Sequence, residues 1–433
     1  MLDVFSSGMM SVWLEMAGVD RDRFNATTRQ FWEGGLSEVL WLDRPDPVAE
    51  AIVEEYLNRL ARRGLSSQVQ GVWIQGGPFA LAGNVGETPL PAASITKVAT
   101  SLAALQTWTP DYQFETLVAA TGPVENGVLR GDLVIVGGDN PFFVWEEAFT
   151  LGNALNQMGI RQVAGNLAIA GNFSMNYESD PQVAGNFLRQ ALDSSQWTAE
   201  AEDQYARLAS GLPKPQVEIA GSVTATAPPQ NLPPLIRHKS LPLAEIIKQM
   251  NIYSNNPMSE MLAQSVGGAV VVRQKAAAAA GVPVEEIRLI NGSGLGHENQ
   301  ISPRAATAMF AALDRYLRDT DLTVADLFPV SGRDLGTLEF RNIPKSSAVK
   351  TGSLFDVSAL AGALPTRDRG VVWFAIINRG TGLDSLRDEQ DWLLQQLVNQ
   401  WGTPEILPVA LQTHIDGRRP ALGDPRRIEI IDN

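Results

Sequence analysis

Apolar and polar positions in the first part of the chain follow the spacing of a helix. In residues 46–63 every fourth position from Val48 to Leu60 is apolar, so these side chains share one face. Asp46 stands where an N-cap residue is expected, and Pro47 suits the first turn that follows it. The pattern therefore predicts a helix with one buried face.

The next segments alternate between strand and helix patterns. Residues 69–75 and 79–85 are short apolar runs on either side of Gly76-Gly77-Pro78, which predicts a β-hairpin. The Ala- and Leu-rich residues 94–108 predict a buried helix. The C-terminal third predicts three strands and a last helix, in residues 347–351, 358–364, 370–378 and 385–401. This mixture of helices and strands indicates an α/β (α+β) protein.

The middle of the chain has a different pattern. Short β-like pieces lie in residues 116–121, 127–136 and 163–170, separated by turns that contain Gly and Asn. A polar stretch and a Pro-rich stretch follow them, and helical spacing returns at Leu243. We therefore predict that residues 116–235 form an inserted accessory domain that is mostly β.

The insertion divides the rest of the chain into two parts of one domain. In our prediction residues 1–115 and 236–401 form this discontinuous domain, with further helices in residues 258–281 and 303–318. Residues 402–433 are rich in Pro, Arg and Asp and form a C-terminal tail. The sequence leaves open whether this tail is a linker, an interaction segment or disordered.

Composition and charge exclude several classes of function. The formal net charge of −14 would repel phosphate backbones, so no nucleic acid partner is expected. The absence of cysteine excludes thiol nucleophiles, zinc–thiolate sites and disulfides. The three histidines are scattered without HExxH spacing, so we predict no metal site and no cofactor. No apolar run is long enough to predict a transmembrane segment.

The most suggestive chemistry lies at the start of the predicted buried helix. Residues three apart share a helical face, so the amine of Lys97 can lie beside the hydroxyl of Ser94. A lysine can deprotonate an alcohol where burial and a second cation disfavour the charged form of its amine. Taken alone, the pattern is weak, because Ser347-Ala-Val-Lys350 also matches it. The ordinary alternative is an N-cap serine followed by a solvated lysine.

A second polar segment, Tyr253-Ser254-Asn255-Asn256, breaks the chain between two predicted helices. The hydroxyl of Ser254 and the amide of Asn256 can hydrogen-bond the lysine, the nucleophile and a substrate carbonyl together. Ser-x-Asn is a common pattern, and Ser174-Met-Asn176 matches it as well. As an isolated segment it would more often be a loop that caps the next helix.

A third segment, Lys350-Thr351-Gly352-Ser353, lies at the edge of a predicted strand. Lys350 can place a positive charge near Lys97 and can also bind an anionic substrate terminus. Gly352 permits a close approach of the backbone to another group. Alone, the segment has an ordinary explanation as an edge lysine that prevents aggregation, followed by a turn glycine.

The three segments are more specific together than separately. Ser-x-x-Lys on a helix, Ser-x-Asn between helices and Lys-Thr-Gly on a strand occur in the order found in penicillin-binding proteins and class A β-lactamases. Competing chemistry has less support, because the chain contains no G-x-S-x-G elbow. The glycines of Gly292-Ser-Gly294-Leu-Gly296 do not have the spacing of a dinucleotide-binding loop.

The chain resembles the D-alanyl-D-alanine carboxypeptidases/endopeptidases of the class C low-molecular-mass penicillin-binding proteins. The resemblance extends beyond the three motifs and covers about residues 71–378. The additional similar segments are residues 124–134, 137–141, 159–167, 291–295, 301–304, 328–332 and 336–338. The fold implied is that of penicillin-binding proteins and serine β-lactamases, an antiparallel sheet flanked by helices, with the inserted domain after the nucleophile helix.

The resemblance implies a serine D,D-peptidase that acts on peptidoglycan peptides ending in D-Ala and is acylated by β-lactam antibiotics. Residues 1–115 and 236–401 would be its penicillin-binding domain. Ser94 would be the acylated nucleophile and Lys97 its base. Ser254 would relay the proton to the leaving D-alanine, and Asn256 would hold the substrate amide and Lys97.

The same resemblance assigns the third motif to substrate binding. Lys350 and Thr351 would bind the terminal carboxylate, Gly352 would permit close approach, and the backbone N–H groups of Ser94 and Ser353 would form the oxyanion hole. The alternatives are a related β-lactamase or esterase, and a non-catalytic relative that binds peptidoglycan or an envelope protein. The family implies a periplasmic or cell-envelope location, although the N-terminus lacks the features of a convincing signal peptide.

Overall fold

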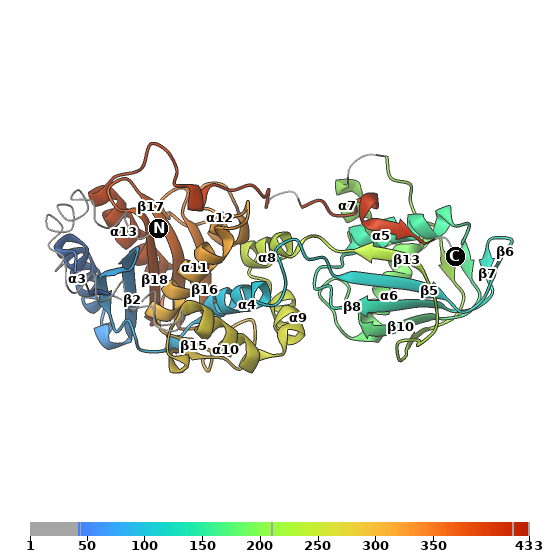
Figure 1. The fold of residues 1–433 in the computed structure, drawn as a ribbon, viewed down its shortest axis with the longest axis horizontal. Coiled ribbons are helices and arrows are strands. Elements are labelled where there is room, and N and C mark those ends of the chain that lie inside the picture. Colours follow the sequence, from blue (N-terminus) through green and yellow to red (C-terminus); the bar gives the residue numbers. More distant parts are fainter. Residues whose placement is uncertain (1–41, 44, 209–210, 418–419, 432–433) are drawn as a thin grey trace, which may run out of the picture.

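The computed structural model describes residues 42–43, 45–208, 211–417 and 420–431, which form two lobes joined side by side (Figure 1). The N-terminal segment considered as a signal peptide lies outside these residues. Among the residues described, no helix has both the length and the apolar character that crossing a membrane requires. The larger lobe carries all three motifs.

A six-stranded sheet forms the centre of the larger lobe. Its strands lie in the order β1-β3-β2-β18-β17-β16, and all pairs are antiparallel except β1 with β3. The strands are β1 (Leu42–Asp43), β2 (Gln70–Gly76), β3 (Phe79–Asn84), β16 (Ala348–Leu354), β17 (Val357–Thr366) and β18 (Gly370–Arg379). The predicted hairpin and the three predicted C-terminal strands are therefore confirmed. The edge strand β16 carries the Lys-Thr-Gly segment.

Helices cover both faces of this sheet because successive strand residues point to opposite faces. In β18, Phe374 packs into one core with α3 (Pro47–Ala61) and α13 (Leu383–Trp401). Its neighbour Trp373 packs into the other core, with the remaining helices of the lobe. The predicted N-cap of α3 is confirmed, since the Asp46 carboxylate accepts hydrogen bonds from the backbone N–H groups of Val48 and Ala49.

The second face is covered by a cluster of helices around α4 (Thr96–Leu105). All ten residues of α4 are buried, which explains its Ala- and Leu-rich sequence. The surrounding helices are α8 (Leu243–Ile252), α9 (Asn256–Val266), α10 (Ala269–Ala280), α11 (Pro303–Leu317) and α12 (Val324–Leu327). A small sheet of β14 (Ile287–Arg288), β15 (Gln300–Ile301) and β4 (Leu90–Pro91) lies beside them. This cluster places the start of α4 in apolar surroundings.

The smaller lobe contains a six-stranded mixed sheet in the order β12-β10-β8-β5-β13-β19. These strands are β5 (Glu115–Ala120), β8 (Leu133–Gly138), β10 (Leu167–Asn172), β12 (Val223–Ala225), β13 (Pro234–Lys239) and β19 (Ile428–Ile430). A four-stranded sheet consists of β6 (Val124–Glu125), β7 (Val128–Leu129), β9 (Gln162–Val163) and β11 (Glu218–Ile219). The lobe has its own apolar core.

The smaller lobe also contains three helices, so it is a mixed α/β unit and not the mostly β domain that we expected. They are α5 (Trp145–Gln157), α6 (Pro181–Leu192) and α7 (Ala199–Arg207). Gly185 lowers the helical propensity of α6 but is required by packing. A Cβ there would lie 2.4 Å from Val223 Cγ1 and 2.9 Å from Ile169 Cγ1. The helical propensity of the local sequence is therefore lower than the packing of this helix would suggest.

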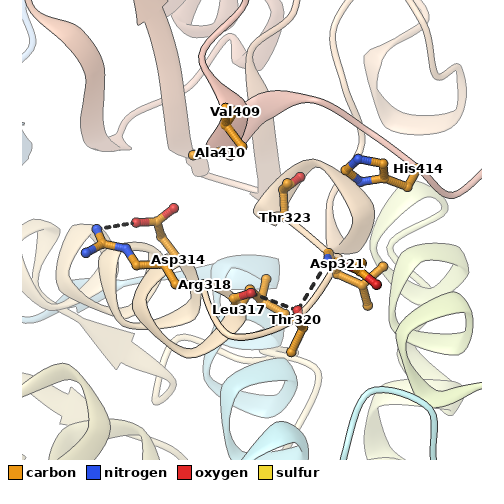
Figure 2. Close-up of a pocket in the computed structure, with 10 residues that line it drawn as sticks. Asp314, Leu317, Arg318, Thr320, Asp321, Thr323, Val409, Ala410 and His414 are labelled. Atoms are coloured by element: carbon orange, nitrogen blue, oxygen red, sulfur yellow. Dashed lines mark hydrogen bonds and ion pairs between the residues drawn. The ribbon is translucent and has the colours of Figure 1, made fainter.

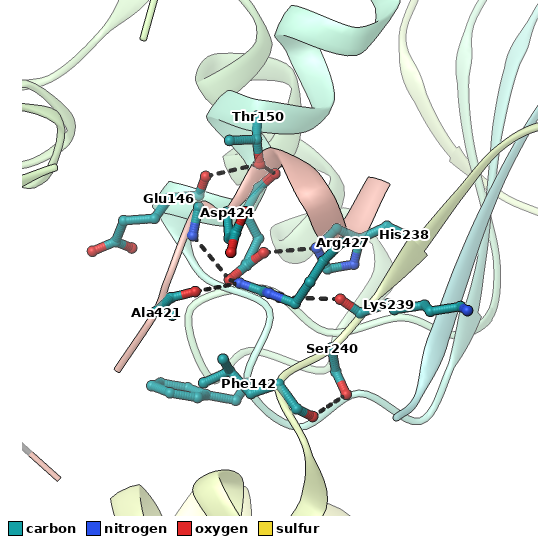
Figure 3. A network of polar contacts seen from close by, with 12 residues as sticks. Phe142, Glu146, Thr150, His238, Lys239, Ser240, Ala421, Asp424 and Arg427 are labelled. Carbon is teal, nitrogen blue, oxygen red and sulfur yellow. Dashed lines mark hydrogen bonds and ion pairs between the residues drawn. The ribbon is translucent and has the colours of Figure 1, made fainter. Parts of the chain in front are cut away.

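The C-terminal segment runs from the larger lobe to the smaller one (Figure 1). In the larger lobe, the Asp326 carboxylate accepts a hydrogen bond from the backbone N–H of Ile415. In the smaller lobe, the buried Glu147 carboxylate bonds both Arg427 and His238. Figure 3 shows Arg427 beside His238 in this network. Strand β19 then pairs with β13. We propose that the chain has the two domains predicted from the sequence, and that β19 belongs to the inserted domain.

Candidate active site

The Ser-x-x-Lys segment lies at the start of α4, as predicted. Ser94 is in the short 3-10 turn Ala93–Ile95 and is partly exposed, whereas Lys97 in the first turn of α4 is fully buried. Lys97 Nζ lies 3.0 Å from Ser94 Oγ, within hydrogen-bonding distance. A partly exposed hydroxyl therefore adjoins an amine that is withdrawn from water.

Two further oxygens surround the amine of Lys97. Its Nζ lies 2.7 Å from Asn256 Oδ1 and 2.8 Å from the backbone carbonyl oxygen of Ser293. Both oxygens can only accept hydrogen bonds, so a neutral amine satisfies them with its two N–H groups. Its lone pair is then left for the Ser94 hydroxyl. The arrangement of acceptors thus suits a lysine that takes a proton from Ser94.

The electrostatics of Lys97 agree with this arrangement. Burial lowers the pKa of the Lys97 ammonium from 10.5 to about 7, while the negative charge of Glu260 acts in the opposite direction. At neutral pH a substantial fraction of Lys97 is therefore uncharged and able to act as a base. This is the physical condition that the sequence argument required.

Ser254 and Lys350 form the second half of the site. Lys350 Nζ donates to Ser254 Oγ at 3.0 Å and to the backbone carbonyl of Thr351 at 2.9 Å. Burial lowers the pKa of Lys350 well below its usual value, and the charge of Lys97 lowers it further. A carboxylate that binds beside Lys350 would raise this pKa again. The second buried amine therefore lies close enough to Lys97 for the two charges to interact, as we expected.

Gly352 brings the two halves of the site together. A Cβ at this position would lie 2.9 Å from the backbone oxygen of Ala92, 3.0 Å from the backbone nitrogen of Ser94 and 3.1 Å from Ala93 Cβ. Strand β16 therefore passes directly against the segment that carries the nucleophile, as the close-approach prediction required. Strand alternation points Thr351 and Ser353 to the other face of β16, but β16 is the edge strand of its sheet, so residues of both faces border the site.

Two residues of the site hold backbone conformations that L-residues disfavour. Ala93, just before the nucleophile, has φ of +46°, and Ser254 has φ of +53°. Left-handed conformations of this kind cost on the order of 1–3 kcal/mol each and occur mostly where function requires them. The surrounding contacts fix both residues in place.

The loop after β14 is organised by a carboxylate that no sequence motif marks. The Glu260 carboxylate, on α9, accepts hydrogen bonds from the backbone N–H groups of Gly292 and Ser293, each at 3.0 Å. Asn299 Oδ1 accepts from the backbone N–H of Ile290 in the same loop. These bonds aim the Ser293 carbonyl at Lys97. The sequence signal was the Asn-Gly-Ser-Gly segment, which we noted only as a family resemblance.

We predict that Glu260→Gln changes the pH dependence of acylation as well as its rate. Without the negative charge the pKa of Lys97 falls further, so the loss of rate on acidification begins at a lower pH than in the wild type. The maximal rate falls about tenfold, because a glutamine cannot accept from both N–H groups. Acylation rates between pH 5 and 9 test this.

Glu298→Gln is the matched control for this prediction, because Glu298 is an exposed carboxyl near the same loop. It is expected to leave both the rate and the pH profile unchanged. If Glu260→Gln lowered the rate at every pH by one factor, its carboxylate would have only a structural role.

The other sequence matches lie outside this arrangement. Ser347, from the second Ser-x-x-Lys match, is fully buried and donates to the carbonyl of Pro344. Ser174, from the second Ser-x-Asn match, donates to the carbonyl of Asn140 in the smaller lobe. A cavity of about 650 Å³ beside the C-terminal segment, lined by Asp314 and His414 among others, contains no motif residue (Figure 2). The described residues include no group of three or more potential metal ligands.

Comparison with known proteins gives one family and several related structures. The model of the D-Ala-D-Ala carboxypeptidase 3 (S13) family matches residues 58–180 and 178–400. The chain is 23% identical over 384 residues to the D-alanyl-D-alanine carboxypeptidase DacB of Haemophilus influenzae, in an alignment that covers 66% of this chain and 79% of that protein.

Two solved structures show the same fold at low sequence identity. A predatory peptidoglycan endopeptidase of Bdellovibrio bacteriovorus superposes with a TM-score of 0.66 at 22% identity, covering 80% of this chain and 96% of that one. Penicillin-binding protein 4 of Haemophilus influenzae gives a TM-score of 0.57 at 19% identity, covering 79% and 98% respectively. The predicted fold of penicillin-binding proteins and serine β-lactamases, an antiparallel sheet flanked by helices, is confirmed.

Proposed function

Since the chain belongs to the D-Ala-D-Ala carboxypeptidase 3 (S13) family of serine peptidases, we propose that it hydrolyses D-alanyl bonds of peptidoglycan peptides at Ser94. The observation that carries this proposal is the set of contacts around Lys97. One buried amine lies within hydrogen-bonding distance of a serine hydroxyl and of two obligate acceptors. This is the arrangement that a lysine base for a serine nucleophile needs.

Acylation follows from these positions. The neutral amine of Lys97 takes the proton of Ser94, and Ser94 Oγ attacks the carbonyl carbon of the penultimate D-alanine. The backbone N–H groups of Ser94 and Ser353 stabilise the resulting oxyanion. The proton that Lys97 took from Ser94 is relayed through the Ser254 hydroxyl to the leaving amine, which leaves Lys97 neutral and Ser254 protonated; the C–N bond breaks, and the terminal D-alanine departs. Asn256 holds Lys97 and the substrate amide throughout.

Deacylation reverses the same proton transfers. Water loses a proton to the neutral amine of Lys97 and attacks the ester carbonyl. The bond to Ser94 Oγ then breaks, and Lys97 returns this proton to Ser94. The net reaction adds one water across one amide bond. The neutral form of Lys97 is needed in both halves of the reaction, so activity falls as the pH drops below about 7.

Lys350 and Thr351 would hold the terminal carboxylate of the substrate. The fully buried amine of Lys350 has only the Ser254 hydroxyl and the Thr351 carbonyl as hydrogen-bond partners among the contacts described. An arriving carboxylate would supply the counter-charge that this amine lacks. Substrates without a free terminal carboxylate, such as C-terminal amides, would then bind poorly.

A β-lactam would enter the same pathway up to the acyl-enzyme. Its amide carbonyl replaces the D-alanyl carbonyl, and its carboxylate replaces the terminal carboxylate beside Lys350. The leaving amine remains tethered to the acyl group, so it stays near Ser94 and obstructs water. We expect long-lived acylation by penicillins, and we place the protein in the cell envelope, where its proposed substrate is found.

Release of free D-alanine from a synthetic peptide that ends in D-Ala-D-Ala tests the proposal. The matched control peptide ends in D-Ala-L-Ala, which has the same composition and charge. Release of the terminal alanine from the first peptide and not from the second is the expected result. Binding of the D-Ala-D-Ala peptide without release of any product would instead identify a non-catalytic member of the family.

A further inference from the structure

A third buried lysine lies in the larger lobe, and the proposed reaction does not use it. Lys248 is on α8, the helix that leads directly into Ser254. The side chains of Lys248 and Asp334 are both fully buried, and Lys248 Nζ lies 2.8 Å from Asp334 Oδ2. Burial lowers the pKa of the Lys248 ammonium, and the negative charge of Asp334 acts in the opposite direction. The two residues form a buried ion pair on the helix that precedes the second motif.

The contacts of this pair hold α8 against its neighbours. A buried ion pair adds little net stability, because the cost of removing both charges from water offsets their attraction. Lys248 Nζ also donates to the backbone carbonyls of Ala325 at 2.8 Å and Phe328 at 2.6 Å, so each of its three hydrogens has an acceptor. Asp334 Oδ2 accepts a further hydrogen bond from the backbone N–H of Val330 at 2.8 Å. The pair therefore fixes α8 to α12 and to the segment that follows α12.

The segment after α12 continues to the strand that carries the third motif. Val330 forms an antiparallel bridge with Ala348, the first residue of β16. Lys248 therefore connects the helix that precedes Ser254 to the beginning of the strand that carries Lys350. The two ends of this connection meet in the site, where Lys350 Nζ donates to Ser254 Oγ at 3.0 Å.

Asn251 connects the same helix to α4. Its Nδ2 donates to Ser101 Oγ and to the backbone carbonyl of Leu327, each at 3.1 Å. Ser101 Oγ in turn donates to the backbone carbonyl of Lys97 at 2.7 Å. Residues three apart share a helical face, so Lys248 and Asn251 act from one side of α8. This side of α8 is therefore attached both to the helix of the proposed base and to the segment beside β16.

The residue that follows these contacts has to meet a leaving amine. Ser254 has φ of +53°, a conformation that persists only where the surrounding structure fixes it. A proton relay also works only within hydrogen-bonding distance of the nitrogen that it protonates. Resting on the proposed function, we propose that Lys248 and Asp334 are a positioning pair, which holds the Ser254 hydroxyl where it relays the proton to the leaving amine.

A thioester substrate separates this role from a general structural one. The amine that leaves a peptide ending in D-Ala-D-Ala must gain a proton as the C–N bond breaks. The thioester analogue has sulfur in place of that N–H group and keeps the same terminal carboxylate. Its leaving group departs as a thiolate without a proton, because a thiol is a far stronger acid than an amine N–H. Displacement of Ser254 should therefore slow cleavage of the amide and spare the thioester.

The variant replaces both members of the pair, Lys248→Met with Asp334→Asn, so that no unpaired charge stays buried. The asparagine oxygen can still accept from the Val330 N–H. We expect kcat/KM for the amide to fall about tenfold or more, because small displacements of a proton donor are costly, and kcat/KM for the thioester to change less than about threefold. The matched control is Arg59→Met with Glu389→Gln, which removes an ion pair between α3 and α13 on the other face of the central sheet. It should change neither value.

Ser254→Ala tests whether the pair acts through Ser254. This variant should also lose activity mainly on the amide. Adding Lys248→Met and Asp334→Asn to Ser254→Ala should then lower kcat/KM for the amide no further, because the hydroxyl that the pair positions is already absent. If thermal unfolding shows that the paired substitution does not fold, Asp334→Asn alone is measured, and it should lose at least about threefold on the amide only.

Three outcomes contradict the inference. Equal losses on the amide and the thioester would show that the pair only supports the fold. Unchanged cleavage of the amide would show that Ser254 keeps its place without the pair. A further tenfold loss in the Ser254→Ala background would show that the pair acts on another group. A wild-type protein that cleaves neither substrate would instead contradict the proposed function itself.

Discussion

Lys97→Ala is expected to lower the rate of acylation by benzylpenicillin by about 10³-fold, within the range that general-base catalysis contributes. The substitution removes the base and leaves Ser94 as an ordinary alcohol that no neighbouring amine deprotonates. Release of D-alanine should fall by a similar factor, because the same amine is needed in both steps. Time courses of acyl-enzyme formation and of D-alanine release measure the two effects.

The pH profile separates loss of the base from loss of structure. Wild-type acylation should rise about tenfold per pH unit below pH 7 and level off above it, because the pKa of Lys97 is lowered to about 7. The residual acylation rate of Lys97→Ala should not show this rise with pH. The control is Lys239→Ala, at an exposed lysine on β13 in the inserted domain. If Lys97→Ala retained more than a tenth of the wild-type rate, another group would have to be the base.

Gly352→Ala is expected to reduce acylation at least about 100-fold while the protein still folds. The added Cβ would lie 2.9–3.1 Å from atoms of residues 92–94, two of which are backbone atoms that cannot rotate away. Strand β16 must therefore move away from the nucleophile segment. A misplacement of about 1 Å in an active site can cost on the order of 100-fold in rate. Acylation rate and thermal unfolding should be measured together.

Gly76→Ala is the matched control for Gly352→Ala. Gly76 also lies in the central sheet, but the nearest atom to its added Cβ is Leu81 Cδ1 at 3.3 Å, the end of a flexible side chain. This variant should keep nearly full activity. Unimpaired acylation in Gly352→Ala would mean that the close approach of β16 to Ser94 is not needed.

Much of the larger lobe could be predicted from the sequence because its elements carry strong local signals. The N-cap at Asp46, the glycines of the hairpin and the apolar strands each specify their own conformation. The proximity of Lys97 to Ser94 also follows from local geometry, since residues three apart share a helical face. These are the features for which sequence reasoning is sufficient.

The convergence of the three motifs could not be derived from local geometry. Lys97 and Asn256 are 159 positions apart, and only the family resemblance placed them together. The Ser293 carbonyl could not have been found, because a backbone group has no side-chain signature. Glu260 was missed for a related reason, since a helical glutamate usually points to solvent and nothing in its neighbours marks it as a loop anchor.

The inserted domain was harder to predict because packing overrides local preference there. Gly185 weakens the helical signal of α6, yet it is the only residue type that fits against Val223 and Ile169. Strand β19 is equally hard to predict from the sequence, because its partner β13 precedes it by almost 200 residues. Pairing over such a distance leaves no pattern in the short segment itself.

Intact-mass spectrometry after incubation with benzylpenicillin tests whether Ser94 is the acylated nucleophile, with the wild type and Ser94→Ala treated in parallel. If Ser94 is this nucleophile, the wild type gains the mass of one benzylpenicillin molecule and a folded Ser94→Ala variant gains nothing. An unmodified wild-type protein, or an adduct of equal yield on Ser94→Ala, would contradict it.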